Sequence, residues 1–287
     1  MLIQSRSRPL DLLVVGGLTV DRFADGSSAP GGSVLHAIRA AAERRLRIGV
    51  VTAAGPEPEA QAGLVELHRL AAGLEVATHA ATWTFRHRDS IDGRRLWLEQ
   101  RGGPVAWAGG APDGRRTRAI LYAPVADEVD VAALNSWEEV RARSAILQGW
   151  LRSTGEDGEV LQRPLLALDD RLCEALGRLD LVVASREDLS AEGDAPSDQL
   201  AALRVTLGAG PALVVTDGAD GLWLDVGGDR EHLPVVWLVE DVPTVGAGDV
   251  LATFLTMGAA DPPGGWHAHA ERAMRVVAEV LDGRKRR

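Results

Sequence analysis

The most informative part of the sequence is Asp241-Val-Pro-Thr-Val-Gly-Ala-Gly-Asp249, which is followed by Val250-Leu-Ala-Thr-Phe-Leu-Thr-Met257. The apolar run 235–239 before it predicts a strand, and apolar residues at helical spacing after it predict a helix. Between them Gly246, Ala247 and Gly248 form an almost bare backbone turn at the helix N-terminus. Such a turn directs free N–H groups and the positive end of the helix dipole at one point, an arrangement that binds anions.

Asp249 places a carboxylate in the first turn of this predicted helix, beside the anion site. Because two neighbouring negative charges repel, a carboxylate here is a poor choice for anion binding alone. It makes chemical sense if Asp249 takes the proton of a hydroxyl group that attacks the anion. A simple helix cap is the alternative, since Asp often caps helices and a lone glycine motif is weak evidence.

The order Pro-Thr-Val-Gly-Ala-Gly-Asp at 243–249 resembles the C-terminal signature Asp-Thr-x-Gly-Ala-Gly-Asp of the ribokinase-like (PfkB) carbohydrate kinases. The resemblance implies that the turn 246–248 is the anion hole for the transferred phosphoryl group, that Asp249 is the catalytic base and that Thr244 belongs to the ATP site. The family pattern also raises a monovalent cation as a cofactor. Pro243, which stands where the pattern has Asp, weakens that expectation.

The N-terminal part predicts the other end of the site. Leu12-Leu-Val-Val15 is a continuous apolar run, typical of a parallel strand buried on both faces. Asp21 follows where ligands of open α/β sheets bind, although a loop cap is the alternative. Pro30-Gly-Gly-Ser-Val34 resembles the family's N-terminal signature and opens an Ala-rich helix predicted over 33–46. The acceptor contacts that the resemblance implies are Asp21, Gly31 and Gly32.

Two further strand ends stand where the family has its nucleotide-binding motifs. Strand 181–185 ends in Ser185-Arg-Glu-Asp188, where the family has Asn-x-x-Glu, and strand 211–216 ends in Thr216-Asp-Gly218, where it has Thr-x-Gly. The resemblance implies that Ser185, Asp188, Thr216 and Gly218 bind ATP, and that Asp188 holds Mg²⁺ through water. For Ser185 and Asp188, local sequence alone favours a Ser cap with an acidic first turn.

The segments 83–88 and 94–99 each alternate polar and apolar residues around the turn sequence Asp89-Ser-Ile-Asp-Gly93, which predicts a β-hairpin. The hairpin interrupts a β-α-β alternation, so we expect it to project from the main sheet. An ordinary surface hairpin is the alternative. The resemblance implies lid elements at about 18–30 and 82–108 that close over the acceptor, and a homodimer formed through the lid.

Composition excludes several classes of protein. The chain has 287 residues and a net charge of −10, which argues against a nucleic-acid binder, and the basic run Arg284-Lys-Arg-Arg287 is predicted to be a solvated tail. Lys285 is the only lysine, so Walker-type and protein-kinase chemistry are excluded. The single Cys173 fits a reducing cytoplasm, and the absence of an apolar run of about 18 residues predicts no membrane span. Arg152 at a strand end could reach a phosphate, but a lone arginine more often belongs to a surface ion pair, and that is the prediction for this residue.

These observations predict one α/β domain over 1–287: a doubly wound, ribokinase-like sheet flanked by helices, with a small β lid. The function implied by the resemblance is transfer of the ATP γ-phosphoryl group to a hydroxyl of a sugar, polyol or nucleoside in the cytoplasm, with Mg²⁺. The run Gln148-Gly-Trp-Leu-Arg152 resembles plant inositol kinases and related bacterial sugar kinases. A catalytically weak binding protein on the same fold is the alternative. A dinucleotide dehydrogenase is disfavoured, because Gly16-Gly17 lacks the required glycine spacing.

Overall fold

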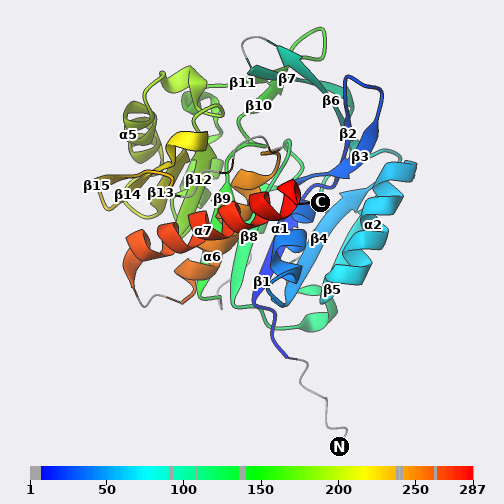
Figure 1. The fold of residues 1–287 in the computed structure, drawn as a ribbon, viewed down its shortest axis with the longest axis horizontal. Helices are drawn as coiled ribbons and strands as arrows, with labels where there is room; N and C mark the ends of the chain where they lie inside the picture. The colour runs from blue at the N-terminus through cyan, green and yellow to red at the C-terminus, as the bar shows by residue number, and fades with distance from the viewer. Residues whose placement is uncertain are drawn as a thin grey trace, which may run out of the picture.

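The computed structural model describes residues 8–90, 93–107, 109–135, 140–236, 239, 242, 244–261 and 264–286. Within them, nine strands form one sheet in the order β15-β14-β13-β12-β9-β8-β1-β4-β5, in which neighbouring strands are parallel except for the antiparallel pairs β13–β14 and β14–β15 at one edge (Figure 1). Its strands are β1 (Leu12–Gly16), β4 (Ile48–Ala54), β5 (Gly73–Thr78), β8 (Ala119–Ala123), β9 (Ala142–Ile146), β12 (Leu181–Ser185), β13 (Ala212–Thr216), β14 (Leu222–Val226) and β15 (Asp229–Leu233).

Both faces of this sheet are covered, as the continuous apolar strands predict. In β1, Leu12 and Val14 pack into one apolar core, and Leu13 and Val15 pack into the other. The helices on the first face are α1 (Ser33–Ala42), α2 (Pro58–Leu70), α6 (Ala247–Ala259) and α7 (Gly265–Lys285). Those on the second are α3 (Val131–Leu134), α4 (Asp170–Leu176) and α5 (Pro196–Leu207). The doubly wound α/β fold class is therefore confirmed.

A separate four-stranded sheet lies beyond the carboxyl ends of the parallel strands, at the top of Figure 1. Its order is β3-β2-β6-β7, and its strands are β2 (Thr19–Arg22), β3 (Ser28–Gly31), β6 (Trp83–Ser90) and β7 (Gly93–Gln100). The predicted hairpin is present as β6 and β7, and β2 pairs with β6 in parallel. Residues 101–107 form neither helix nor strand. A small hairpin of β10 (Arg152–Thr154) and β11 (Val160–Gln162) lies nearby in the figure.

Three predicted elements differ from the structure. The first helix ends at Ala42 rather than at residue 46, because Arg45 adopts a left-handed φ of 57° and Leu46 N–H bonds back to the Ala41 carbonyl. The sequence over 130–140 also predicts a helix, but within the described residues it forms only the short α3, and residues 136–139 lie outside them. The strand predicted over 235–239 is displaced, since β15 ends at Leu233 and residues 234–236 are irregular, while residues 237 and 238 lie outside the described residues.

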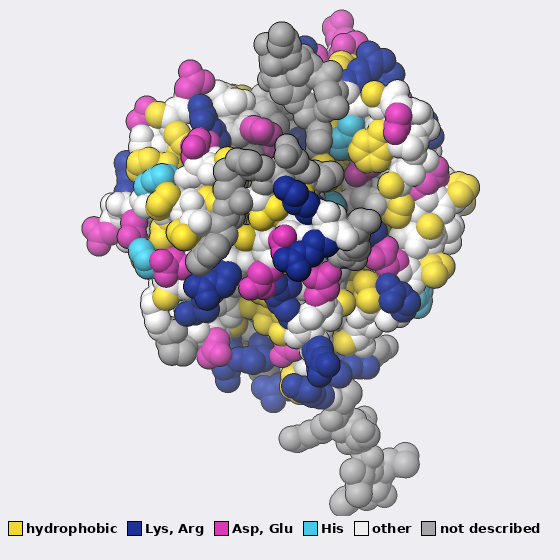
Figure 2. All heavy atoms as spheres, viewed as in Figure 1, with side chains coloured by type: hydrophobic (Ala, Val, Ile, Leu, Met, Phe, Trp, Pro, Cys, Tyr) yellow, Lys and Arg dark blue, Asp and Glu magenta, His cyan; other side chains and the backbone are white. Residues whose placement is uncertain are grey.

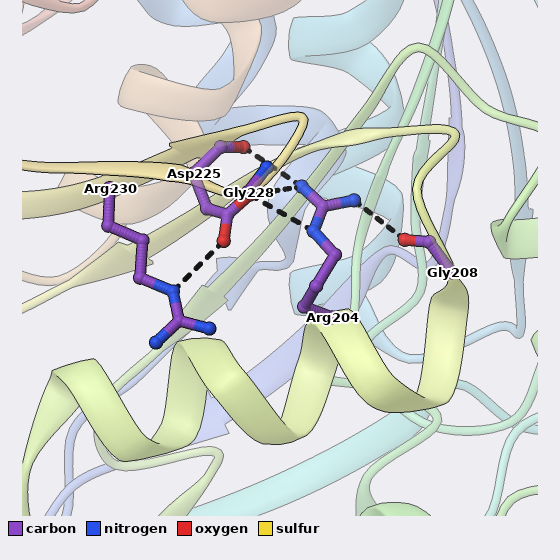
Figure 3. Close-up of polar contacts among 5 residues, drawn as sticks. All are labelled: Arg204, Gly208, Asp225, Gly228 and Arg230. Atoms are coloured by element: carbon purple, nitrogen blue, oxygen red, sulfur yellow. Dashed lines mark hydrogen bonds and ion pairs between the residues drawn. The ribbon is translucent and has the colours of Figure 1, made fainter.

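A buried charge cluster ties the antiparallel edge of the sheet to α5 (Figure 3). Asp225 of β14 is fully buried and accepts hydrogen bonds from Arg204 Nε at 3.0 Å, Arg230 Nε at 3.1 Å and the Gly228 N–H at 3.0 Å. Arg204 also donates to the Gly208 carbonyl at the end of α5. Burial by itself raises the pKa of Asp225, but these hydrogen bonds outweigh it and the net pKa is lowered. The cluster therefore fixes the edge hairpin through an ionised carboxylate.

The described part of the chain contains no helix that is both long enough and apolar enough to span a membrane.

Candidate active site

The predicted site residues come together at one edge of the main sheet. Because the central strands are parallel, their carboxyl ends lie on the same side, at Gly16, Ala123, Ile146, Ser185 and Thr216. The loops that carry the acceptor and nucleotide motifs start at these ends. Helix α6, which carries the glycine turn, packs against β8, β9 and β12 in the middle of the sheet.

The glycine turn has the geometry that the sequence predicts. Gly246 is the N-cap of α6, with a left-handed φ of 78°. The N–H of Ala247 donates to the Thr244 carbonyl at 2.9 Å, so this amide is already engaged. Gly248 is exposed, and a Cβ built on it would meet no atom within 4 Å. The turn is therefore open to a ligand on the side of Gly248. Pro243 lies outside the described residues.

Asp249 lies in the first turn of α6 and is half-buried. Gly246 rather than Asp249 occupies the N-cap position, and no side chain caps this helix. The carboxylate of Asp249 makes no hydrogen bond or ion pair with another described residue, and its backbone carbonyl accepts the Thr253 hydroxyl at 2.7 Å. The structure therefore does not support a capping role for Asp249, and its carboxylate is available for binding or catalysis.

The predicted acceptor residues form a second group. Asp21 lies in β2, accepts the Thr19 hydroxyl at 3.1 Å and faces His87 of β6, whose Nε2 is 3.4 Å from Asp21 Oδ1. Gly31 is paired with Thr19, and a Cβ built there would come 2.1 Å from Asp21 Oδ2. Gly32 is the N-cap of α1 with a φ of 96°. Both glycines thus allow β3 and the start of α1 to approach Asp21 closely.

His87 was missed by the sequence reasoning. Both ring nitrogens are buried and lack a hydrogen-bond partner among the described residues, and the ring stacks on Phe23 at a centroid distance of 5.2 Å. The only sequence signal was its position on the predicted hairpin. Its partner Asp21 could not be identified locally, because parallel pairing of β2 with β6 brings the two together.

The predicted nucleotide residues lie on two adjacent strands, since Ser185 is paired with Thr216 at the ends of β12 and β13. Asp188 Oδ2 accepts the Ser185 N–H at 3.0 Å, and Asp188 N–H donates to Ser185 Oγ at 3.0 Å. This reciprocal capping is the local arrangement that the sequence favours. Burial raises the pKa of Asp188. Gly218 is exposed, with a φ of 55°, and no described atom lies within 4 Å of a Cβ built there.

No three His, Cys, Asp or Glu side chains of the described residues are grouped so that they could hold a metal ion. Asp188 is therefore not part of a ready-made protein metal cage.

The prediction that Arg152 forms a surface ion pair is wrong. Its guanidinium is buried, donates from Nη1 to the Val125 carbonyl at 2.6 Å and lies 5.5 Å from the centre of the Phe85 ring. Burial lowers the pKa of Arg152, and four nearby carboxylates oppose this shift. These carboxylates belong to Asp188, Asp249, Glu128 and Asp21. One arginine therefore lies within electrostatic reach of the nucleotide, glycine-turn and acceptor groups.

Glu128 is a second residue that the sequence reasoning missed. Its side chain is buried, and its carboxylate accepts the N–H groups of Val125 at 2.9 Å and Ala126 at 2.8 Å. Burial raises the pKa of Glu128 despite these hydrogen bonds. The Val125 carbonyl in the same loop accepts the hydrogen bond from Arg152. Glu128 therefore stabilises the loop that binds the Arg152 guanidinium. An acid in a short loop carries no sequence signal for this role.

The sequence does not predict a site role for His36, because a histidine on a helix is more often a packing or surface residue than a ligand. The structure places its ring against the glycine turn, because a Cβ on Gly246 would lie 2.3 Å from the ring. Burial lowers the pKa of His36, while Asp249 raises it and Asp21 does so more weakly. His36 therefore packs against the glycine turn and lies within electrostatic reach of Asp249 and Asp21. Its position one turn after Gly31-Gly32 was the available signal.

Neither the models of known protein families nor the sequences of curated proteins match this chain. Solved structures do match it. A pyrophosphate-dependent kinase in the ribokinase family, complexed with a pyrophosphate analog and myo-inositol, aligns at a TM-score of 0.73 and 16% identity over 94% of this chain and 95% of its own.

Arabidopsis thaliana ribokinase, complexed with ribose and ATP, aligns at a TM-score of 0.70 and 15% identity over 96% of this chain and 93% of its own. Fructokinase from Vibrio cholerae O395, with bound fructose, ADP and calcium ion, aligns at a TM-score of 0.64 and 17% identity over 94% and 91%. These likenesses extend over nearly the whole chain. It follows that the chain has the fold of the ribokinase-family carbohydrate kinases.

Proposed function

We propose that this protein transfers the γ-phosphoryl group of ATP to a hydroxyl group of a small sugar, an inositol-like polyol or a nucleoside. The observation that carries the proposal is the position of Arg152, a buried cation within reach of Asp21, Asp188 and Asp249. A cation among three predicted binding and reacting groups suits a site in which negative charge is transferred. Solved structures of this fold with ribose and ATP, or with fructose and ADP, support the substrate class.

The proposed reaction follows from the positions of these groups. Asp21 orients the acceptor hydroxyl, and Asp249 takes its proton as the new bond from oxygen to phosphorus forms. The bond from phosphorus to the bridging oxygen of the donor breaks, and the leaving group keeps the electron pair. The open side of the glycine turn and the Arg152 guanidinium stabilise the charge on the transferred group. Backbone amides and arginine thus replace the lysine that this chain lacks outside Lys285.

We assign Mg²⁺ to the donor phosphates rather than to a protein cage. When bound, the ion neutralises phosphate charge and keeps several waters. Asp188 fits a water-mediated contact, because Ser185 N–H occupies Oδ2 and no hydrogen bond to Oδ1 is found within the described residues. Thr216, Gly218 and Thr244 complete the proposed ATP site. We further propose that the sheet of β2, β3, β6 and β7 acts as a lid and as a dimer contact, and that the protein is cytoplasmic.

The alternative is a protein that binds the same ligands with weak turnover. The reciprocal bonding of Ser185 and Asp188 favours it, since both side chains are partly satisfied without a nucleotide. Pyrophosphate is the second donor to test, because a pyrophosphate-dependent kinase has this fold. An assay with ATP or pyrophosphate and a panel of sugars, polyols and nucleosides separates these hypotheses. Phosphorylated product from ATP supports the proposal, whereas binding without product supports the alternative.

The decisive variant is Asp249→Asn, which keeps the size of the side chain and removes its ability to accept a proton. Turnover should fall by about 10²–10⁴-fold, the usual range for loss of a general base. Nucleotide affinity should hold or improve, because a negative charge near the phosphates is removed. A folded Asp249→Asn protein that phosphorylates its acceptor at the wild-type rate contradicts the mechanism.

A further inference from the structure

A side chain of the C-terminal helix reaches the glycine turn. Arg284 lies in the last turn of α7, and its Nη1 donates to the Val245 carbonyl at 2.8 Å. Val245 directly precedes Gly246, so this bond acts where the chain enters the turn. The prediction of a solvated tail is wrong for Arg284, because α7 continues to Lys285 and brings this side chain back to the turn.

The positive charge of Arg284 lies close to His36 and to the glycine turn. Arg284, His36 and Val245 line one cavity of about 460 Å³ beside α1, α2 and α7. Arg284 is among the groups that lower the pKa of His36, whose ring packs on Gly246, although burial is the largest cause. On the face drawn in Figure 2, basic and acidic side chains lie side by side over the middle of the molecule. The hydrogen bond to the Val245 carbonyl holds the positive charge of Arg284 beside the turn.

The described residues do not fit a monovalent cation at the Val245 carbonyl. Alkali cations in proteins are held by several oxygen atoms, commonly backbone carbonyls. Here the carbonyl accepts a hydrogen bond from a guanidinium, which would repel a second cation a few ångströms away. Pro243 also has no carboxylate to offer at the start of this segment. Geometry and sequence thus both argue against the cation that the family resemblance raised.

We propose that Arg284 is a built-in cation for the glycine turn. Its guanidinium holds the Val245 carbonyl, fixes the approach of the chain to Gly246 and adds positive charge behind the anion site. The protein therefore needs no monovalent cation. That the bound anion is a donor phosphate rests on the proposed function, whereas the positioning of the turn by Arg284 does not.

The first experiment tests wild-type protein in KCl and in tetramethylammonium chloride at equal ionic strength. Thermal unfolding and calorimetric binding of ATP and pyrophosphate are measured in both salts. We expect the same midpoint and the same affinities, because the guanidinium already occupies the carbonyl. A rise in midpoint or in affinity that is specific to K⁺ overturns the proposal.

The second experiment compares Arg284→Met, which keeps an apolar stem, with Arg284→Lys, which keeps a charged donor. Arg286→Met is the matched control, since Arg286 is largely exposed and pairs only with Asp282 among the described residues. We expect Arg284→Met to weaken the binding of ATP and of pyrophosphate about 10-fold. This is the lower end of the affinity loss seen when a residue that orients the ligands of a site is removed. Arg284→Lys should recover most of this loss, and Arg286→Met should bind as wild type does. Unchanged binding in Arg284→Met overturns the proposal.

Hydrogen exchange of the peptide 244–250 gives a readout that needs neither turnover nor a bound anion. Exchange should be faster in Arg284→Met than in wild type, and close to wild type in Arg284→Lys and Arg286→Met. Equal exchange in Arg284→Met and wild type overturns the positioning role. If no acceptor is ever phosphorylated, the proposed function fails while this measurement still decides the role of Arg284.

Discussion

The ring of His36 lies directly against Gly246, so that a Cβ on this glycine would come 2.3 Å from the ring atoms Cγ and Nδ1. Two constraints therefore require glycine at position 246: the left-handed φ of 78° and the lack of space for a Cβ beside the His36 ring. Gly248, two residues later in the same turn, has neither constraint and faces open space. The two glycines offer a matched test of which part of the turn is structural and which part binds a ligand.

The first prediction contrasts Gly246→Ala with Gly248→Ala. Gly246→Ala should destabilise the protein by at least about 1–2 kcal/mol, the approximate penalty of left-handed backbone for an L-residue, with the clash against His36 in addition. Gly248→Ala should leave stability unchanged or raise it by up to about 1 kcal/mol, because Ala favours a helix more than Gly does. Urea unfolding measures both effects. Wild-type stability of Gly246→Ala would show that the turn rearranges freely.

The same two variants should behave differently in ligand binding. Gly248→Ala, which keeps its stability, should be the variant that loses affinity for ATP. In Gly248→Ala the new methyl group projects into the open side of the turn, where we place the phosphoryl group. Calorimetry with ATP should therefore show weakened binding in a fully folded protein. Tight ATP binding by Gly248→Ala would locate the anion elsewhere.

The second prediction concerns Arg152. Arg152→Met removes the buried cation near Asp21 and Asp249 and should reduce turnover by about 10²-fold or more, the range seen when one preorganised charge-stabilising group is lost. Arg163→Met is the control, because Arg163 also donates from Nε to a backbone carbonyl of this segment, that of Trp150 at 2.6 Å. Both variants should lose some thermal stability, but only Arg152→Met should lose phosphoryl transfer. Equal turnover in the two variants would leave Arg152 with a purely structural role.

The third prediction separates acceptor binding from donor binding. Asp21→Asn should weaken the proposed acceptor end, where Asp21 faces His87, and raise the KM for the acceptor. ATP affinity measured without acceptor should stay at the wild-type value, since Asp21 lies in the small sheet and the proposed ATP-binding residues lie at the ends of β12 and β13. Steady-state kinetics and calorimetry give the two values. A change confined to ATP affinity would reverse the assignment of the two ends.

The fourth prediction concerns the Asp225 cluster and pH. Arg204→Met leaves a buried carboxylate without its main partner and should destabilise the protein by about 3–5 kcal/mol at pH 7. The exposed pair of Arg178 and Glu174 provides the control, because Arg178→Met should change stability by about 1 kcal/mol or less. Urea unfolding at pH 7 is the measurement.

The pH dependence of this effect has a defined sign. The pKa of Asp225 is lowered in the folded protein, so its stabilising contribution is complete above the unfolded value of about 3.9. That contribution is lost as the pH falls through the lower folded pKa. The difference between wild type and Arg204→Met should therefore narrow as the pH falls below about 4. A difference that stays constant down to the lowest pH at which both proteins fold would show that the ionised carboxylate is not its source.

Much of the fold was predictable because it follows from local patterns. Continuous apolar runs such as Leu12–Val15 must be buried on both faces, and a parallel sheet between two helix layers satisfies that requirement. The alternation in 83–99 predicted the hairpin of β6 and β7, because alternating residues give a strand one apolar face and one polar face. The small residues at 246–248 predicted the turn, because few other residues allow a left-handed entry into a helix.

Boundaries and isolated side chains were less predictable. The end of α1 depends on one left-handed residue, Arg45, which has no sequence signal for that conformation. The alternatives for Ser185 and Asp188 could not be separated in the sequence, and the structure shows the capping bonds that local pattern favours. Arg152 was expected at the surface, because nothing local indicates that the loop before Glu128 covers it.

Most of the strands and helices, and the bare turn that precedes a helix, could be read from the sequence, since they depend on residues close together in the chain. The fold was needed to show that His87 faces Asp21, that Arg152 lies within electrostatic reach of four carboxylates and that Arg284 binds the Val245 carbonyl. Each of these contacts joins segments far apart in the sequence. They exist because the strand order and the packing of α7 bring those segments together, and a local pattern carries no record of that order.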